Sequence, residues 1–268
     1  MSRAVRKLRD VRTWAGSVRT PIDWPAATLL ALCRTRPAVG RMAGAAMGRV
    51  WVRPSLLRGI PVGIDPRSAA QFTIYQEVFI DGVYDLTRLA FEPDAVLDCG
   101  AFEGYFSLLA RAHFPSPPII AFEPDAANFK GLRVNTADPG LRITAQPSAV
   151  STADGEVAFS GGGCGGRLDP GANGTVRVPV RNLLDVLDQM TPQRLLLKLD
   201  IEGEESNLLP ALLPRLPRQC AMFFEWHHGA ESYEQVSKLL VANGFETSLV
   251  RRNELDGAIY IDAFAQRR

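Results

Sequence analysis

The residues with the clearest chemical potential form two groups in the second half of the chain. The first is a glycine turn, Asp98-Cys-Gly-Ala-Phe-Glu-Gly104, which follows an apolar run and precedes an apolar periodic segment. That order predicts a strand, a tight turn and a helix, and glycine at the turn lets backbone N–H groups approach a ligand closely. About twenty residues later a second apolar run ends in Glu123, whose carboxylate could grip two ribose hydroxyls. Together these features predict a nucleoside-binding site.

A second group brings acidic, basic and imidazole side chains to two strand ends. Its members are Lys198, Asp200 and Glu202, at the end of one apolar run, and Glu225, His227 and His228, at the end of the next. Residues 198, 200 and 202 would face one side of an extended chain, because side chains alternate along a strand. Carboxylates and imidazole can act as general bases or bind a divalent metal. The metal ligands would be Asp200, Glu225 and His227, but no spacing rule demands them. For Lys198 the alternative is a plain ion pair with Glu202 or Glu225.

The composition is ordinary for a globular protein, but charge is distributed unevenly along the chain. The net charge of +1 hides 12 Lys and Arg against 2 Asp in residues 1–58, and 18 against 27 acidic residues in the remainder. This asymmetry predicts a basic segment on an acidic domain, and the basic segment would suit an anionic membrane surface or glycan. Residues 1–20 have apolar side chains three apart, as in a basic amphipathic helix; a helix packed on the domain, or a frayed terminus, is the alternative. The net acidic charge of residues 59–268 disfavours nucleic acid as a substrate.

Cysteine usage and hydropathy indicate a cellular location. The four cysteines are widely spaced, without a C-x-x-C pair, so we expect free thiols in a reducing compartment. No apolar run reaches the length of a membrane span, and the early run at 26–33 lacks the cleavage pattern of a signal peptide. The expected location is the cytoplasm, with peripheral membrane contact through residues 1–58.

Apolar periodicity and turn residues predict alternating strands and helices from residue 95 onward. We expect strands at 95–99, 118–123, 141–146, 195–200, 220–226, 245–250 and 257–264, and helices at 104–113, after Pro124 to 135 with Asp125 as the N-terminal cap, and at 182–189, 206–213 and 231–243. This alternation predicts an α/β fold with a seven-stranded, mostly parallel sheet. The last strand would be antiparallel, because residues 251–256 are short enough for a hairpin. Residues 1–65 are assigned to a basic, mainly helical N-terminal extension and residues 66–268 to the main domain.

Three motifs give the chain a family resemblance. Val96-Leu-Asp-Cys-Gly-Ala-Phe-Glu-Gly-Tyr-Phe-Ser107, Ala121-Phe-Glu-Pro-Asp125 and Leu196-Leu-Lys-Leu-Asp-Ile-Glu-Gly-Glu-Glu205 are similar to motifs of the FkbM methyltransferase family. The third motif is the family-specific one. The resemblance implies a Rossmann-like class I methyltransferase fold, S-adenosyl-L-methionine as cofactor, and transfer of a methyl group to a hydroxyl of a carbohydrate or secondary metabolite. A nicotinamide-binding turn, the alternative for the first motif, has the spacing G-x-G-x-x-G instead of G-x-x-x-G.

The resemblance also implies roles for single residues. Gly100 and Gly104 would form the turn beside the methionine part of the cofactor, and Asp98 would steady that turn and reach the amino-acid end. Glu123 would bind the ribose hydroxyls, and Ser148 would lie near the adenine. The other implied cofactor contacts are Ala101, Phe102, Tyr105, Phe106, Pro124, Ala149 and Asp200. Family members usually have Asn at the position of Phe102, so a polar contact in the turn is missing or replaced by stacking.

Methyl transfer to a hydroxyl needs in-line positioning, which can lower the activation barrier by roughly 7–11 kcal/mol. It also needs a base, which can raise the rate by about 10²–10⁴-fold. His227 is the first candidate for the base, because its pKa would lie near working pH, and Asp200 is the second. The remaining predicted catalytic residues are Glu225 and Lys198, and those predicted to face the acceptor are Glu202, His228 and Arg167. The glycine loop 161–174 could be a lid or a disordered connection. A nucleic-acid or protein acceptor, or an inert cofactor-binding scaffold, are the alternatives.

Overall fold

The computed structural model describes all of the chain except residues 1–12, 19–22, 161–166, 169–175, 256–257 and 268. The chain divides into two compact units, residues 1–82 and 83–268. The sequence analysis put the domain boundary at 65/66 instead, which would join α4 (Ala69–Gln76) to the main domain. That boundary stays a prediction.

The first unit is mainly helical among its described residues. It contains α2 (Trp24–Thr35), α3 (Pro37–Met47), β1 (Val50–Val52), η2 (Ser55–Leu57), β2 (Val62–Ile64), α4 and the π-helical turn η3 (Glu77–Asp81). Prolines open α2 and α3, where a missing N–H costs nothing. The Ser68 hydroxyl caps α4 by accepting a hydrogen bond from the Gln71 N–H. Residues 13–16 are helical, and the rest of the amphipathic helix predicted in residues 1–20 lies mostly outside the described residues.

The second unit alternates strands and helices around one sheet. The strands of this sheet are β3 (Ala95–Cys99), β4 (Ile119–Phe122), β5 (Ile143–Gln146), β10 (Arg194–Leu199), β11 (Gln219–Trp226), β12 (Glu246–Leu255) and β13 (Ala258–Arg267). The helices are α5 (Tyr105–His113), α6 (Ala126–Asn135), α7 (Leu183–Met190), α8 (Glu205–Leu212) and α9 (Ala230–Ala242), with short 3₁₀ turns η4 (Leu86–Arg88) and η5 (Pro139–Leu141). Asp125 caps α6 by accepting hydrogen bonds from the N–H groups of Ala127 and Asn128, as predicted.

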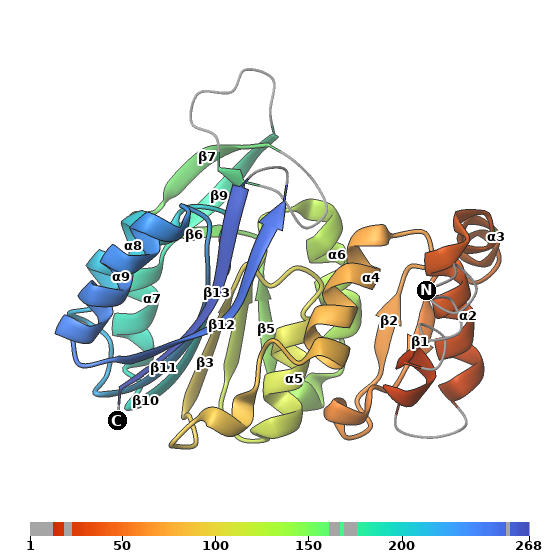
Figure 1. Cartoon of the computed structure of the whole chain (residues 1–268), viewed down its shortest axis with the longest axis horizontal. Coiled ribbons are helices and arrows are strands. Elements are labelled where there is room, and N and C mark those ends of the chain that lie inside the picture. The colour runs from red at the N-terminus through yellow and green to blue at the C-terminus, as the bar shows by residue number, and fades with distance from the viewer. Residues whose placement is uncertain (1–12, 19–22, 161–166, 169–175, 256–257, 268) are drawn as a thin grey trace. The chain divides into compact units, whose positions relative to one another are not determined.

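Strand order confirms the predicted fold class. The seven strands run in the order β12-β13-β11-β10-β3-β4-β5, and all pairs are parallel except those of β13, which is antiparallel to β11 and β12. Helices α7, α8 and α9 cover one face of the sheet, and α5 and α6 cover the other (Figure 1). Because both faces are covered, β3 and β10 are almost continuously apolar and buried. The chain therefore has the Rossmann-like fold of class I methyltransferases.

The terminal hairpin is longer than the sequence analysis predicted. The strands extend over 246–255 and 258–267, whereas the predicted ranges were 245–250 and 257–264. Pairing continues through the charged residues because Arg251 lies opposite Asp262 and its Nε donates a 2.7 Å hydrogen bond to Oδ2. A register shift between Leu249 and Arg251 bends the strand at this point. Charged residues that looked like a loop are therefore part of the sheet.

A smaller sheet follows β5. Its strands are β6 (Ala149–Ser151), β7 (Gly155–Ser160), β8 (Arg167–Leu168) and β9 (Val176–Asn182), in the order β6-β9-β7-β8. The Ser151 hydroxyl donates a 2.6 Å hydrogen bond to Glu204, in the turn after β10, so β6 lies beside the carboxyl end of the main sheet. Within the described residues, none of the helices combines the length and hydrophobicity that crossing a membrane requires.

Candidate active site

The turns after β3 and β10 are in backbone contact. The N–H of Asp200 donates a 3.1 Å hydrogen bond to the carbonyl of Cys99. Gly100 adopts φ 79°, and a Cβ at this position would lie 1.7 Å from the carbonyl oxygen of Asp200. Only glycine fits, both for its conformation and for its space. Gly104, at φ 83°, then precedes the first turn of α5. The contact places the predicted cofactor turn beside the predicted catalytic group.

A buried lysine fixes this contact. Lys198 lies opposite Asp98 in the register of β10 and β3. Its Nζ donates a 2.7 Å hydrogen bond to the carbonyl of Gly100 and lies 3.6 Å from Asp98 Oδ1 and 3.4 Å from Asp200 Oδ2. The alternative ion pair of Lys198 with Glu202 or Glu225 is not formed among the described ion pairs, because the strand register places Asp98 opposite the lysine. Burial acts to lower the pKa of Lys198, but the carboxylates of Asp200 and Asp98 outweigh it and raise that pKa, so the lysine stays charged.

Asp98 is a buried carboxylate that contacts the residues around the first turn. Its side chain is completely buried, and Oδ2 accepts a 2.6 Å hydrogen bond from the Ser107 hydroxyl in α5. Burial raises the pKa of Asp98, against the opposing effects of Lys198 and Ser107. The steadying half of its predicted role is visible in these contacts. The predicted reach to the cofactor is not, since the side chain exposes no surface to a ligand.

Glu123 ends β4 next to the same turn. Its Oε2 accepts a 2.7 Å hydrogen bond from the Phe102 N–H, and Oε1 accepts a 2.9 Å bond from the Asp125 N–H. Burial raises the pKa of Glu123 to about 7 despite these bonds. The carboxylate is therefore poised to lose or gain a proton near neutral pH, and added hydrogen-bond donors would favour its charged form.

Ser148 provides the clearest sign that a polar ligand fits here. The residue is 3% exposed, and its hydroxyl finds no hydrogen-bond partner within the described part of the chain. An unpaired buried hydroxyl costs free energy, so natural structures rarely keep one without a partner. A nucleobase could supply that partner. The glycine turn, Glu123 and Ser148 thus fit a nucleoside-containing cofactor.

The other predicted cofactor residues are placed less directly. Ala101, Tyr105 and Phe106 are buried, and Phe106 packs against the rings of Tyr84 and Phe223, so these side chains belong to the core. Phe102 is half-buried at φ 53°, with its ring at the edge of the Tyr105 ring. Pro124 is half-buried and Ala149 is buried. A ligand at this turn would therefore meet backbone groups of residues 100–105 more than their side chains.

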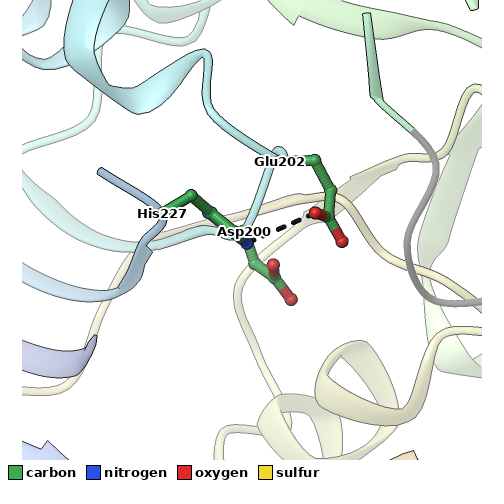
Figure 2. Close-up of side chains that lie close together, drawn as sticks. All are labelled: Asp200, Glu202 and His227. Atoms are coloured by element: carbon green, nitrogen blue, oxygen red, sulfur yellow. Dashed lines mark ion pairs between the residues drawn. The ribbon is translucent and has the colours of Figure 1, made fainter. Parts of the chain in front are cut away.

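Three side chains converge just beyond β10 and β11. Asp200, Glu202 and His227 are half-buried and approach one another from two strand ends (Figure 2). Nε2 of His227 lies 3.4 Å from Glu202 Oε2, and Nδ1 lies 3.2 Å from Glu205 Oε1. The chain is not extended here as predicted, because Glu202 has φ 55° and belongs to a turn. This turn, rather than strand alternation, brings Glu202 to the group.

The charge of His227 differs from the sequence-based expectation. Burial acts to lower the pKa of His227, but Glu205, Asp200 and Glu225 outweigh it and raise that pKa to about 10. With this environment the imidazole is protonated at neutral pH and cannot accept another proton. The reason for ranking His227 first as base was therefore wrong: a free imidazole titrates near neutral pH, but one between two carboxylates does not. Asp200 becomes the leading candidate for the base.

The other members of the predicted group lie around these three. Glu225, Tyr84 and Asp262 line a small cavity of about 10 Å³, room for roughly one water molecule. Burial, together with Asp200 and Asp262, raises the pKa of Glu225. Glu225 is outside the set of atoms close enough to share a metal ion, and Glu202 takes its place beside Asp200 and His227.

The two histidines are now distinguished. His227 faces the carboxylates, whereas the exposed His228 contacts the carbonyl of Gly203 through Nε2 at 2.7 Å. The predicted acceptor contact of His228 stays a prediction. The backbone of Arg167 belongs to β8, but its side chain and the loop 161–166 and 169–174 lie outside the described residues.

Sequence reasoning missed three residues of the site. Glu205 is completely buried and accepts hydrogen bonds of 2.8 Å from the Ile201 N–H and 2.9 Å from the Gly203 N–H. It stands at the start of α8, and its place at the end of the third motif was a usable signal. Asp262 and Tyr84 carried no comparable signal, since only the pairing of β13 and the path of the chain before β3 bring them near.

Comparisons with known proteins agree with the fold and the motifs. A family model described as the methyltransferase FkbM domain matches residues 98–247. The AMB antimetabolite synthetase AmbE of Pseudomonas aeruginosa is 35% identical over 88 residues, which is 32% of this chain and 4% of that protein. The methyltransferase sdnD of Sordaria araneosa is 41% identical over 68 residues, 25% of this chain and 26% of that protein. This chain thus matches only a small part of either relative.

The similarity to a solved structure is weaker. The methyltransferase FkbM of Methylobacillus flagellatus KT is 15% identical, with a TM-score of 0.49 over 98% of this chain and 59% of that chain. The family model covers more than half of the present chain, from Asp98 at the first turn to Thr247 in β12. The chain therefore belongs to the FkbM methyltransferase family.

Proposed function

We propose that this methyltransferase is S-adenosyl-L-methionine-dependent and methylates a hydroxyl oxygen of a carbohydrate or secondary metabolite. The observation that carries the proposal is the backbone contact between Gly100 and Asp200. It sets a turn suited to a nucleoside cofactor directly beside a carboxylate suited to take a proton. The name of one relative, an antimetabolite synthetase, supports a small-molecule acceptor.

The cofactor would be held by groups of the first turn and of β4. The backbone N–H groups at the start of α5 would face its amino-acid part. Glu123 would accept hydrogen bonds from the ribose hydroxyls, and the unpaired Ser148 hydroxyl would meet the base. When bound, S-adenosyl-L-methionine supplies a methyl carbon that is electrophilic because it is attached to a sulfonium sulfur.

Asp200 would handle the proton of the acceptor. Its side chain is 26% exposed, at the carboxyl end of β10, where it can meet a hydroxyl group. The Asp200 carboxylate would take up the hydroxyl proton when the acceptor oxygen is methylated. Lys198, 3.4 Å away, holds that carboxylate in place. His227, a cation in this environment, would favour the oxygen as it gains negative charge.

Two measurements test this proposal. Calorimetry with S-adenosylhomocysteine should show one saturable site, and absence of binding would refute the cofactor assignment. A screen for labelled methyl transfer onto sugars, polyketides, peptides and RNA should label a hydroxyl-bearing small molecule. Labelling of only RNA or protein would refute the acceptor class.

Asp200→Asn tests the proton acceptor. We expect turnover to fall by about 10²–10⁴-fold, because the amide cannot take up the proton. S-adenosylhomocysteine should still bind within a few-fold of its normal affinity, which shows that the turn is intact. Asp188→Asn, at an exposed ion pair with Arg215, is the matched control and should keep full turnover. Full activity of Asp200→Asn would remove Asp200 from the reaction.

A further inference from the structure

We propose that Asp200, Glu202 and His227 form a binding site for one divalent cation of the kind represented by Mn²⁺ and Mg²⁺. One ligand atom from each of the three side chains can be chosen so that all lie within 4.8 Å of one another. Opposite ligands of an octahedral ion are separated by about 4.2 Å, twice a bond length of about 2.1 Å. A small inward movement of these side chains would therefore enclose an ion. Figure 2 shows the ion pair between His227 and Glu202, with the side chain of Asp200 beside it.

His227 is prepared as a ligand by a carboxylate on its other side. The side chain of His227 is 9% exposed, and its buried Nδ1 makes no hydrogen bond of good geometry within the described residues. The completely buried Glu205 stands 3.2 Å from this nitrogen and is itself held by two backbone N–H groups. The ring is thereby oriented with Nε2 toward Glu202. Metal-binding histidines usually have such a carboxylate or carbonyl partner on the second nitrogen.

Charge balance around the three residues points the same way. Lys198 is shared between Asp98 and Asp200, and Arg251 pairs with Asp262 at 2.7 Å. Among the described ion pairs, neither lysine nor arginine contacts Glu202 or Glu205, whose carboxylates lie 3.4 Å and 3.2 Å from the two ring nitrogens of His227. A divalent cation at Nε2 would add positive charge beside these carboxylates. Carboxylate oxygen with one imidazole is a ligand set that suits such cations.

The half-buried position leaves room for further ligands. All three side chains keep some contact with solvent, so water or an acceptor hydroxyl could complete the coordination. A hydroxyl bound to the cation would lose its proton more easily. This use of the ion rests on the proposed function, whereas the binding of the ion does not.

Titration of chelator-treated protein with Mn²⁺, followed by the paramagnetic resonance signal of free Mn²⁺, tests the site. We expect one site with a dissociation constant below about 1 mM. Glu202→Gln and His227→Gln should each weaken it at least tenfold, and Glu205→Gln should weaken it about 10–100-fold. Asp188→Asn should bind as the unmodified protein does. Absence of saturable binding, or equal binding by all variants, would refute the site and leave His227 itself as the cation of the cluster.

A second measurement does not need folded variants. In the unmodified protein, bound Mn²⁺ should broaden the ring signals of His227 and leave those of His113, at the far end of α5, sharp. Equal broadening of both histidines would refute the location. S-adenosylhomocysteine binding in chelator separates the two proposals: if it persists while Mn²⁺ does not bind, only the metal site fails. If Mn²⁺ binds at His227 but no methyl transfer is found, only the proposed function fails.

Discussion

The turns after β3 and β10 touch each other but differ in how their carboxylates are paired. In the first, Asp98 is paired with Lys198 and Ser107, and Glu123 accepts hydrogen bonds from two backbone N–H groups. In the second, Glu202 and Glu205 converge on a single histidine. The first turn is built to hold its shape without a ligand. The second keeps unbalanced charge at the point where an acceptor would arrive, and such imbalance is common where a protein does chemistry.

Of the variants considered, Lys198→Met should lower the free energy of unfolding most, because it removes the cation that the two turns share. Asp98 would keep the hydrogen bond from Ser107 but lose its buried counter-charge, which typically costs about 3–5 kcal/mol. Denaturant unfolding of the variant should show this loss in the free energy of unfolding. Arg215→Met, at the exposed pair with Asp188, is the control and should cost less than about 1 kcal/mol. A loss as small as the control's would mean that Lys198 is not needed to hold the first turn.

The strand register explains why this lysine's partner was beyond sequence reasoning. The apolar runs, glycine turns and caps are local signals, and they predicted the strands, the Asp125 cap and the antiparallel last strand. Lys198 meets Asp98 only because β10 pairs with β3 in a register that sets these residues opposite each other. In the same way Asp262 reaches the site because it lies opposite Glu225 in the pairing of β11 with β13. Contacts between residues some 100 positions apart in sequence follow from the fold and not from spacing.

Conformation and charge also limited the prediction of the second turn. The left-handed backbone of Glu202 is unusual for a residue with a side chain, and it puts this carboxylate in a turn instead of the extended chain that the sequence analysis predicted. The pKa of His227 depends on Glu205, whose burial could not be known in advance. The sequence thus identified most of the residues of the site but not the state in which they are held.

Gly100→Ala tests whether the two turns must touch. A Cβ would lie 1.7 Å from the carbonyl of Asp200, and alanine would also be strained at φ 79°. We expect a loss of about 3 kcal/mol in the free energy of unfolding, with loss of S-adenosylhomocysteine binding. Gly82→Ala is the matched control, since φ is 67° there and nothing lies within 4 Å, so strain alone should cost about 1 kcal/mol. Equal effects at the two sites would show that contact between the turns is dispensable.

The pKa of about 7 for Glu123 predicts a pH dependence at the first turn. If the carboxylate form binds the ribose hydroxyls, S-adenosylhomocysteine affinity should fall up to about tenfold between pH 8 and pH 6 as Glu123 takes up a proton. Folding should respond in the opposite sense, because a raised carboxyl pKa gives stability that is present at low pH and lost as pH rises through about 7. Calorimetry across this range tests binding, and Glu123→Gln should give weak, pH-independent affinity. A pH-independent affinity in the unmodified protein would contradict the assignment.

Ser148→Ala should have the smallest effect, and it should change stability and ligand affinity in opposite directions. The hydroxyl of Ser148 has no partner in the described chain, so its removal should leave the protein as stable as before or up to about 1 kcal/mol more stable. Binding of S-adenosylhomocysteine should nevertheless weaken about 3–10-fold, because the hydroxyl gains its partner only from the ligand. Ser107→Ala is the contrasting variant: its hydroxyl already bonds Asp98 at 2.6 Å, so its loss should cost about 1–3 kcal/mol of stability. Thermal unfolding and calorimetry of the two variants separate a serine that holds the first turn together from one that awaits a ligand there. If Ser148→Ala lost stability as Ser107→Ala does, Ser148 would belong to the protein's own framework.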